Sequence, residues 1–130
     1  MKGKFLILIG LLVLLYSCQS ESPTAPEPPK PQANIVLDGD FTKSMTSYDR
    51  PQFSGYVKNT GNATGYNCMI EIKAYPNSDK ITIIDTAKGF PADLGDIGPG
   101  QRAYFEAVFF NLTSLNQIVA YDYKITWLDR

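Results

Sequence analysis

The residues that could do chemistry are few, because the chain of 130 residues contains no histidine and only two cysteines. Without histidine, the sequence excludes Ser-His-Asp and Cys-His catalysis and lacks the commonest transition-metal ligand. A zinc site needs several Cys or His ligands, so the sequence indicates none. The remaining candidates are the two thiols, Cys18 and Cys68, and the aspartates that lie close to glycines.

Two pairs of aspartates lie close together in the sequence, Asp38 with Asp40 and Asp93 with Asp96. Paired carboxylates can hydrolyse glycosides, and loop carboxylates also suit calcium. Both pairs lie in glycine-containing segments that are typical of loops, where Asp is a common turn residue. The spacing of a twelve-residue calcium loop is missing. The sequence therefore predicts no enzyme and no cofactor, and these aspartates mark where calcium would bind if the domain used it.

Cys18 stands at the end of a segment that is typical of an export signal. Two lysines precede an apolar run over residues 5–16, which is shorter than the roughly 20 residues that a spanning helix needs. Residues 15–18 (LYSC) resemble a bacterial lipobox. The resemblance implies a signal peptide over residues 1–17, cleavage before Cys18 and a lipid on its thiol. An ordinary cleaved signal, with Cys18 incidental, is the alternative.

Residues 18–32 follow as a Pro-rich linker, with five of the nine prolines of the chain. Proline lacks an amide donor and fixes φ, so we expect an extended, disordered stalk of about 40 Å, at about 3.1 Å per residue. An attached lipid with several chains would hold the protein stably on a membrane. The sequence therefore predicts a lipid-anchored protein of the bacterial cell envelope. In enteric lipoproteins an Asp after the cysteine indicates retention in the inner membrane. By that analogy Gln19 favours the outer membrane, if the organism has one.

Residues 33–130 are predicted to form one all-β domain. Apolar side chains alternate with polar ones over residues 53–58, 67–75, 101–110 and 118–128, and 34–38 and 80–86 are shorter strand candidates. Turn sequences at residues 59–62, 76–79 and 98–100 separate them. This pattern predicts an antiparallel β-sandwich or barrel of six to seven strands. Cys68 falls in the inward phase, which favours a buried thiol. The domain carries two more acidic than basic side chains, so nucleic acid is not an expected partner.

Residues 55–61 (GYVKNTG), and residues 94–101 (LGDIGPGQ) followed by Phe105, resemble FxLYD-type and CARDB-like domains over roughly residues 53–127. The resemblance implies an immunoglobulin-like β-sandwich of the kind found on bacterial and archaeal surface proteins. The Phe-x-Leu-Tyr-Asp signature itself is absent. The shared residues are mostly turn residues. Asn59 and Gly61 can adopt left-handed backbone angles, and Pro99-Gly100 suits the centre of a type II turn.

An outer aromatic face is the main candidate for binding, made of Tyr56, Tyr104, Val108 and Phe110 in the outward phase. In an immunoglobulin-like order, residues 53–58 and 101–110 would be neighbouring strands, so Tyr56 and Tyr104 would lie side by side. Exposed apolar clusters mark binding surfaces. The alternatives are cross-strand pairs that only stabilise the sheet, or cover by residues 39–52.

Taken together, these features predict a membrane-anchored, non-enzymatic lipoprotein that binds or assembles with another envelope or extracellular protein. A carbohydrate- or calcium-dependent binding module that uses the loop carboxylates is the alternative. Nothing in the sequence indicates a small-molecule ligand.

Overall fold

The computed structural model describes residues 23–93 and 95–130, so the predicted signal peptide and Cys18 lie outside the described residues. The described chain contains strands and two short 3-10 turns but no α-helix, which confirms the all-β prediction. The elements are β1 (Ile35–Leu37), β2 (Thr42–Met45), β3 (Pro51–Asn59), β4 (Tyr66–Tyr75), β5 (Asp85–Gly89), η1 (Pro91–Asp93), β6 (Arg102–Val108), η2 (Leu115–Gln117) and β7 (Ala120–Leu128).

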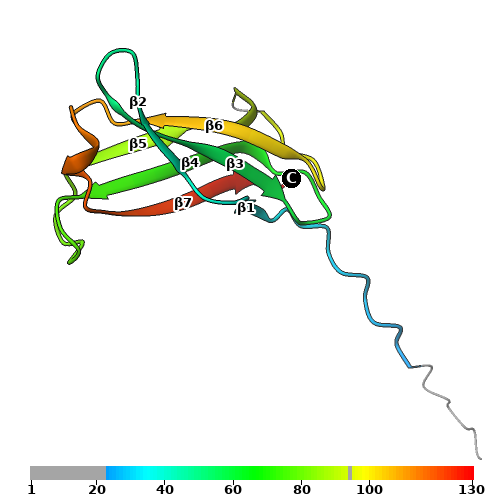
Figure 1. Cartoon of the computed structure of the whole chain (residues 1–130). Helices are drawn as coiled ribbons and strands as arrows, with labels where there is room; N and C mark the ends of the chain where they lie inside the picture. The colour runs from blue at the N-terminus through cyan, green and yellow to red at the C-terminus, as the bar shows by residue number, and fades with distance from the viewer. Residues whose placement is uncertain (1–22, 94) are drawn as a thin grey trace, which may run out of the picture.

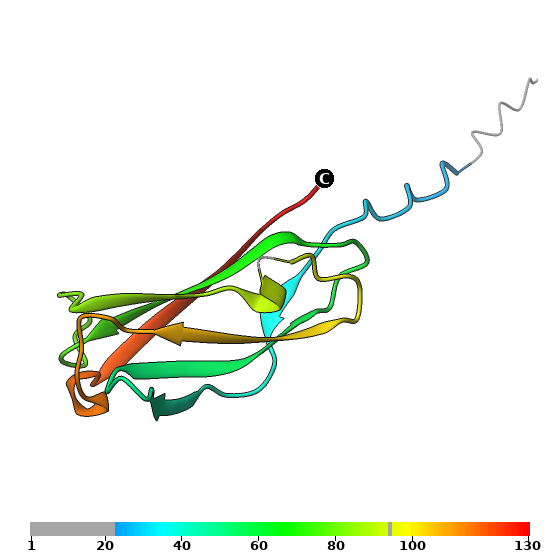
Figure 2. The same cartoon turned by 90° about the horizontal axis from the view of Figure 1, so that it is seen from above.

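The strands are all antiparallel and follow the order β1-β3-β6-β5-β4-β7, with β2 also paired to β3. One residue pair, Gly89 with Ala107, joins β5 to β6, whereas β5 pairs with β4 along its whole length. The sheet therefore folds over at this point into two layers, with β1, β2, β3 and β6 facing β5, β4 and β7 (Figures 1 and 2). This is an immunoglobulin-like order in which the first strand is broken into β1 and β2.

The alternation of the sequence correctly predicts the core between the layers. Ile70, Ile72 and Ala74 of β4 are fully buried, and Phe53 of β3 is buried opposite them. Gly89 makes room for this packing, since a Cβ there would lie 2.9 Å from both Ile70 and Phe105. Glycine at the fold of the sheet thus allows β5 and β6 to approach each other closely.

The strand predicted over residues 80–86 is wrong, because the strand is Asp85–Gly89. The Asp79 side chain accepts a hydrogen bond from the Ile81 amide at 3.0 Å, which turns the backbone of the preceding loop. Lys80 also has a left-handed φ of 55°. Ile81 and Ile83 are consequently exposed on a loop, at 80% and 46%.

Residues 39–52 contain a strand that the sequence pattern does not predict. β2 pairs with the edge of β3 and lies beside it, so it does not cover Tyr56 as the alternative above would require. Phe41, just before β2, packs against rings from three strands, Phe53, Phe105, Tyr121 and Tyr123. This short segment therefore closes the side of the sandwich between β3 and β7.

The turns predicted at residues 59–62 and 98–100 differ in outcome. Gly100 has a φ of 75° and the Gln101 amide donates to the Gly98 carbonyl at 3.0 Å, as expected for a type II turn. Asn59 and Gly61 do not adopt the left-handed angles expected of them. Gly61 is required for another reason, since a Cβ there would lie 2.3 Å from the Gln32 carbonyl oxygen of the passing stalk.

Candidate functional site

The structure places Tyr56 and Tyr104 side by side on the outer face of β3 and β6. The two residues are register partners, and their ring centroids lie 5.2 Å apart. The Arg102 guanidinium stacks 3.7 Å above the Tyr56 ring and forms an ion pair with Asp38. The Tyr104 hydroxyl donates to Glu106 at 3.1 Å. Both rings remain partly exposed, at 40% and 46%, in a frame of charged side chains.

Val108 and Phe110, the other two residues of the predicted face, lie farther along towards the opposite end of β6. They line an open hollow of about 530 Å³ together with Tyr48 and other residues of the β2–β3 connection, Thr46, Ser47, Arg50 and Gln52. Tyr48 is 85% and Phe110 73% exposed. The Arg50 guanidinium donates to the Leu112 carbonyl at 3.2 Å and so links the two loops that form the hollow.

Three connections meet at this end of the sandwich, residues 46–50, 76–84 and 109–119. They meet because the strands alternate in direction, so every second connection returns to the same end. Figures 1 and 2 show these loops at the end opposite the stalk, which joins the domain before β1. We call this the distal end. Each of the three loops contributes at least one strongly exposed apolar side chain to the distal end. These side chains are Tyr48, Ile81, Phe110 and Val119, which are 85%, 80%, 73% and 62% exposed.

Sequence reasoning missed Tyr48, Ile81 and Val119 as parts of this surface. The sequence pattern predicts strands over residues 80–86 and 118–128, which assigns Ile81 and Val119 to a sheet. Tyr48 lies in the segment 39–52, which the sequence predicts only as possible cover. The available signal was an apolar side chain inside a turn sequence, as in Ser47-Tyr48-Asp49 and Asp79-Lys80-Ile81. Such a residue has no core to face, so it stays exposed.

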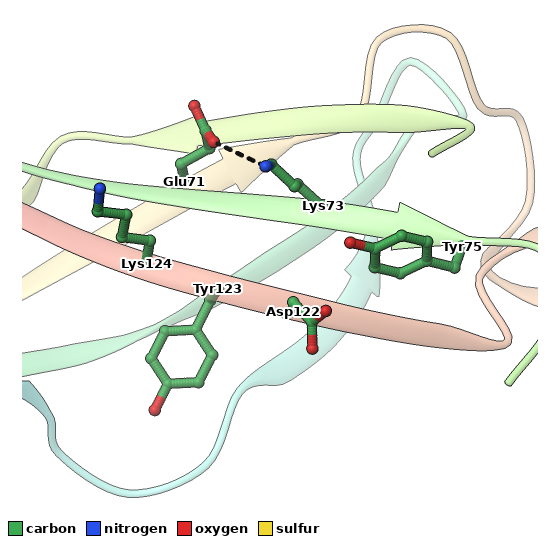
Figure 3. Close-up of a pocket in the computed structure, with 6 residues that line it drawn as sticks. All are labelled: Glu71, Lys73, Tyr75, Asp122, Tyr123 and Lys124. Atoms are coloured by element: carbon green, nitrogen blue, oxygen red, sulfur yellow. Dashed lines mark ion pairs between the residues drawn. The ribbon is translucent and has the colours of Figure 1, made fainter. Parts of the chain in front are cut away.

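A second hollow lies on the outer face of β4 and β7 and is lined mainly by charged residues. Figure 3 shows its lining residues, Glu71, Lys73, Tyr75, Asp122, Tyr123 and Lys124. Glu71 lies 4.0 Å from Lys73, and Asp122 pairs with Lys80. The hydrogen bond from Lys80 holds the pKa of Asp122 below its usual range. This carboxylate therefore stays ionised and is suited to an exposed ion pair rather than to donating a proton.

The four candidate aspartates do not gather into one metal site. Asp38 pairs with Arg102 beside the tyrosines, and Asp40 follows it on the connection to β2. Asp93 ends η1 with a φ of 52°, and Asp96 lies in the loop after it. Across residues 23–93 and 95–130, no three Asp, Glu, Cys or His side chains form a group that could hold a metal ion.

Cys68 is fully buried on β4 and packs in the apolar core. Burial raises the pKa of its thiol, and the Sγ atom donates to the Gly65 carbonyl at 3.5 Å. A neutral, enclosed thiol is a poor nucleophile. The structure thus places Cys68 as a small apolar core residue, as the alternation of residues 67–75 predicts.

In comparisons with family models, with curated proteins and with solved structures, nothing matches this chain. The resemblance to FxLYD-type and CARDB-like domains therefore stays a prediction. No helix within the described part of the chain is long and apolar enough to cross a membrane.

Proposed function

We propose that this chain is a non-enzymatic lipoprotein of the bacterial envelope, anchored through Cys18, that binds another protein with its distal end. The observation that carries the proposal is the set of exposed apolar side chains on three loops at the end opposite the stalk, Tyr48, Ile81, Phe110 and Val119. Exposed apolar surface is costly in water and commonly marks a contact site.

The hollow between Tyr48 and Phe110 is the centre of this surface. Aromatic residues are over-represented among the side chains that dominate binding energy. Apolar side chains of a partner that entered the hollow would gain about 25 cal/mol for each Å² of apolar surface buried. The contact type that fits best is therefore an apolar segment of a protein.

The loops around the hollow are held by hydrogen bonds of their own. Besides the Arg50–Leu112 contact, the Ser114 and Gln117 side chains form a capping box around η2. The Thr46 hydroxyl accepts from the Arg50 amide at 3.1 Å. Loops that are ordered before contact lose less conformational entropy on binding.

The stalk and the distal end lie at opposite ends of the domain. The stalk enters beside β1, and the Gln32 amide donates to the Asn62 side chain at 2.8 Å in the β3–β4 turn. An anchor at Cys18 would thus hold the stalk end of the domain towards the membrane and leave the distal end to face away from it.

Crosslinking on intact cells, followed by affinity capture of the full chain, tests the binding surface. We expect Phe110→Asp to abolish the crosslinked partner, because a carboxylate cannot enter an apolar contact without losing its hydration. Leu128→Asp is the matched control, since Leu128 is also an exposed apolar residue, at 55%, but lies at the end of β7 farther from the distal end. Retention of the partner by Phe110→Asp and Tyr48→Asp, with unchanged melting temperatures, would contradict the proposal.

Mass spectrometry of the mature protein tests the anchor separately. We expect an N-terminus at Cys18 that carries acyl chains, and a Cys18→Ser chain that no longer sediments with membranes. An unmodified and uncleaved N-terminus in the soluble fraction would contradict the lipoprotein assignment.

A further inference from the structure

Asp85 is the one charged side chain that is buried in the described part of the chain, at 7% exposure. It lies at the start of β5, directly after the distal loop of residues 76–84. None of the ion pairs among the described residues involves it. Removal of a carboxylate from water is unfavourable unless the carboxylate is paired or hydrogen-bonded, so the hydrogen bonds of Asp85 must compensate for its burial.

Both oxygens of Asp85 accept hydrogen bonds from N–H groups, and two of the three donors belong to Asn111. The main-chain amide of Asn111 donates to Oδ2 at 2.9 Å, and its side-chain amide donates to Oδ1 at 2.9 Å. The Thr86 amide also donates to Oδ1, at 2.8 Å. A carboxylate only accepts hydrogen bonds, so it matches three donors that a side-chain amide would not match. Hydrogen bonds to a charged acceptor are also stronger than those between neutral groups.

This contact lies where the ladder between β5 and β6 has ended. The two strands share one residue pair, Gly89 with Ala107, and β6 ends at Val108. Continued at the same register, the ladder would bring Asp85 opposite Asn111. The Asp85 side chain therefore supplies hydrogen bonds at a position where the main chain of β5 and β6 no longer pairs.

Asn111 directly follows Phe110, which lines the hollow at the distal end. Phe110 is 73% exposed, so packing within the domain does little to hold its side chain. Its neighbours in the sequence are held instead. Phe109 is fully buried in the core, and the Leu112 carbonyl accepts from the Arg50 guanidinium at 3.2 Å. Asp85 holds the residue between these two, Asn111, so the backbone is fixed on both sides of Phe110.

We propose that Asp85 is a positioning residue for the distal end: its carboxylate holds Asn111 and thereby fixes the backbone that presents Phe110 to a partner. The effect on binding rests on the proposed function. The Asp85–Asn111 contact joins the loop of residues 76–84 to that of residues 109–119, and the Arg50–Leu112 contact joins the latter to residues 46–50. The three loops are thus ordered relative to one another before contact, which lowers the entropy lost on binding.

Hydrogen exchange of the purified full chain in detergent tests whether Asp85 holds the loop. Asp85→Asn keeps the shape of the side chain, but its NH2 group would face an N–H donor. We expect the amides of residues 109–112 to exchange at least about tenfold faster in Asp85→Asn than in the native chain, with exchange in β3 and β4 unchanged. Unchanged exchange at residues 109–112 would overturn the proposal.

Crosslinking on intact cells measures the effect on binding. We expect Asp85→Asn to lower capture of the partner about tenfold, because Phe110 is no longer held in place. Asn59→Ala is the matched control for stability, since Asn59 is buried at the end of β3 where the stalk enters. Compared under conditions in which both variants are folded, Asn59→Ala should retain capture. Full capture by Asp85→Asn despite faster exchange would overturn the positioning role.

A reversed pair provides a second test of the contact. Asn111→Asp alone sets two carboxylates against each other and should release the loop as Asp85→Asn does. The two substitutions together exchange the donor and the acceptor, so we expect the double variant to exchange more slowly and to capture more partner than either single variant. A double variant no better than the single ones would overturn the role of this contact. A native chain that crosslinks no partner would contradict the proposed function, whereas hydrogen exchange needs no partner and still decides whether Asp85 holds the loop.

Discussion

Asn59 holds together the end of the sandwich at which the stalk enters. Its side chain is fully buried, and its amide donates to the carbonyls of Ala63 at 2.7 Å and Ile97 at 2.8 Å. Its carbonyl accepts from the amides of Gly61 at 2.9 Å and Asn34 at 3.1 Å. One side chain therefore satisfies the backbone of three loops that would otherwise lack hydrogen bonds away from water.

Replacement of Asn59 by Ala should lower the free energy of unfolding by about 3 kcal/mol, because several enclosed backbone groups lose their partner at once. Urea denaturation measures this loss. Asn62→Ala is the control, since it removes an exposed hydrogen bond to Gln32 and should cost less than about 1 kcal/mol. Equal losses in the two variants would show that Asn59 has no special role.

Because of Cys68, the free energy of unfolding should fall as the pH rises through the alkaline range. Burial raises the folded-state pKa above the ordinary value of 9.0, so the folded state keeps the proton longer than the unfolded state does. The resulting stability is complete below the unfolded pKa and is lost as the pH rises through the folded pKa.

The measurement is the difference in free energy of unfolding between the native chain and Cys68→Ala. We expect this difference to shrink over the range around and above pH 9.0, the ordinary thiol pKa, because only the native chain must keep a thiol neutral. Comparison with Cys68→Ala removes the contributions that the two chains share. A difference that stays constant over this range would mean that the thiol is not enclosed.

At the scale of elements, β2 and the residue before it decide how the sandwich closes. Phe41 fills the gap between the layers, and the Lys43 ammonium lies over the rings of Tyr121 at 4.6 Å and Phe53 at 5.2 Å. A lysine on a short edge strand also discourages pairing with a further strand. β2 thus covers the edge of β3 along residues 51–54.

The contact between β5 and β6 depends on Gly89. We expect Gly89→Ala to lower the free energy of unfolding by about 2 kcal/mol, since the added methyl would press on Ile70, Phe105 and backbone. Gly98→Ala is the control, because its methyl meets only the flexible Gln101 side chain and should change stability by less than about 0.5 kcal/mol. Thermal and urea unfolding of both variants measure these changes in stability. A Gly89→Ala variant that is as stable as the native chain would contradict the close packing of β5 and β6.

At the scale of the whole molecule, the stalk and the distal loops lie at opposite ends of a narrow domain (Figure 2). Residues 23–31 form no helix or strand and are exposed. The distal loops are therefore held away from residues 23–31.

Deletion of residues 23–30 should abolish capture of the protein partner on cells, because the distal end would no longer reach it. The melting temperature should not change, since these residues make no contact that stabilises the domain. A Gly-Ser segment of equal length is the control and should restore capture, as flexible and Pro-rich linkers both supply reach. Undiminished capture by the deleted chain would show that reach is not needed.

The sequence by itself determined the local structure. Alternation over residues 67–75 and 101–110 predicts which side chains are buried, because inward and outward positions follow one another at a period of two. Pro99 and Gly100 predict a turn because their backbone preferences are intrinsic. The pairing of residues 53–58 with 101–110 also follows, once an immunoglobulin-like order is assumed.

The tertiary structure alone decided which residues share a surface. Val108 and Phe110 separate from the two tyrosines because they lie at the other end of β6, beside Tyr48 of a different loop. Phe41 packs into the core, and the exposed Lys43 reaches over the rings of Phe53 and Tyr121, because β2 pairs with β3, although their segment reads as polar. Periodicity reports whether a residue faces a core, but strand order and register, which arise from long-range pairing, decide which loops meet.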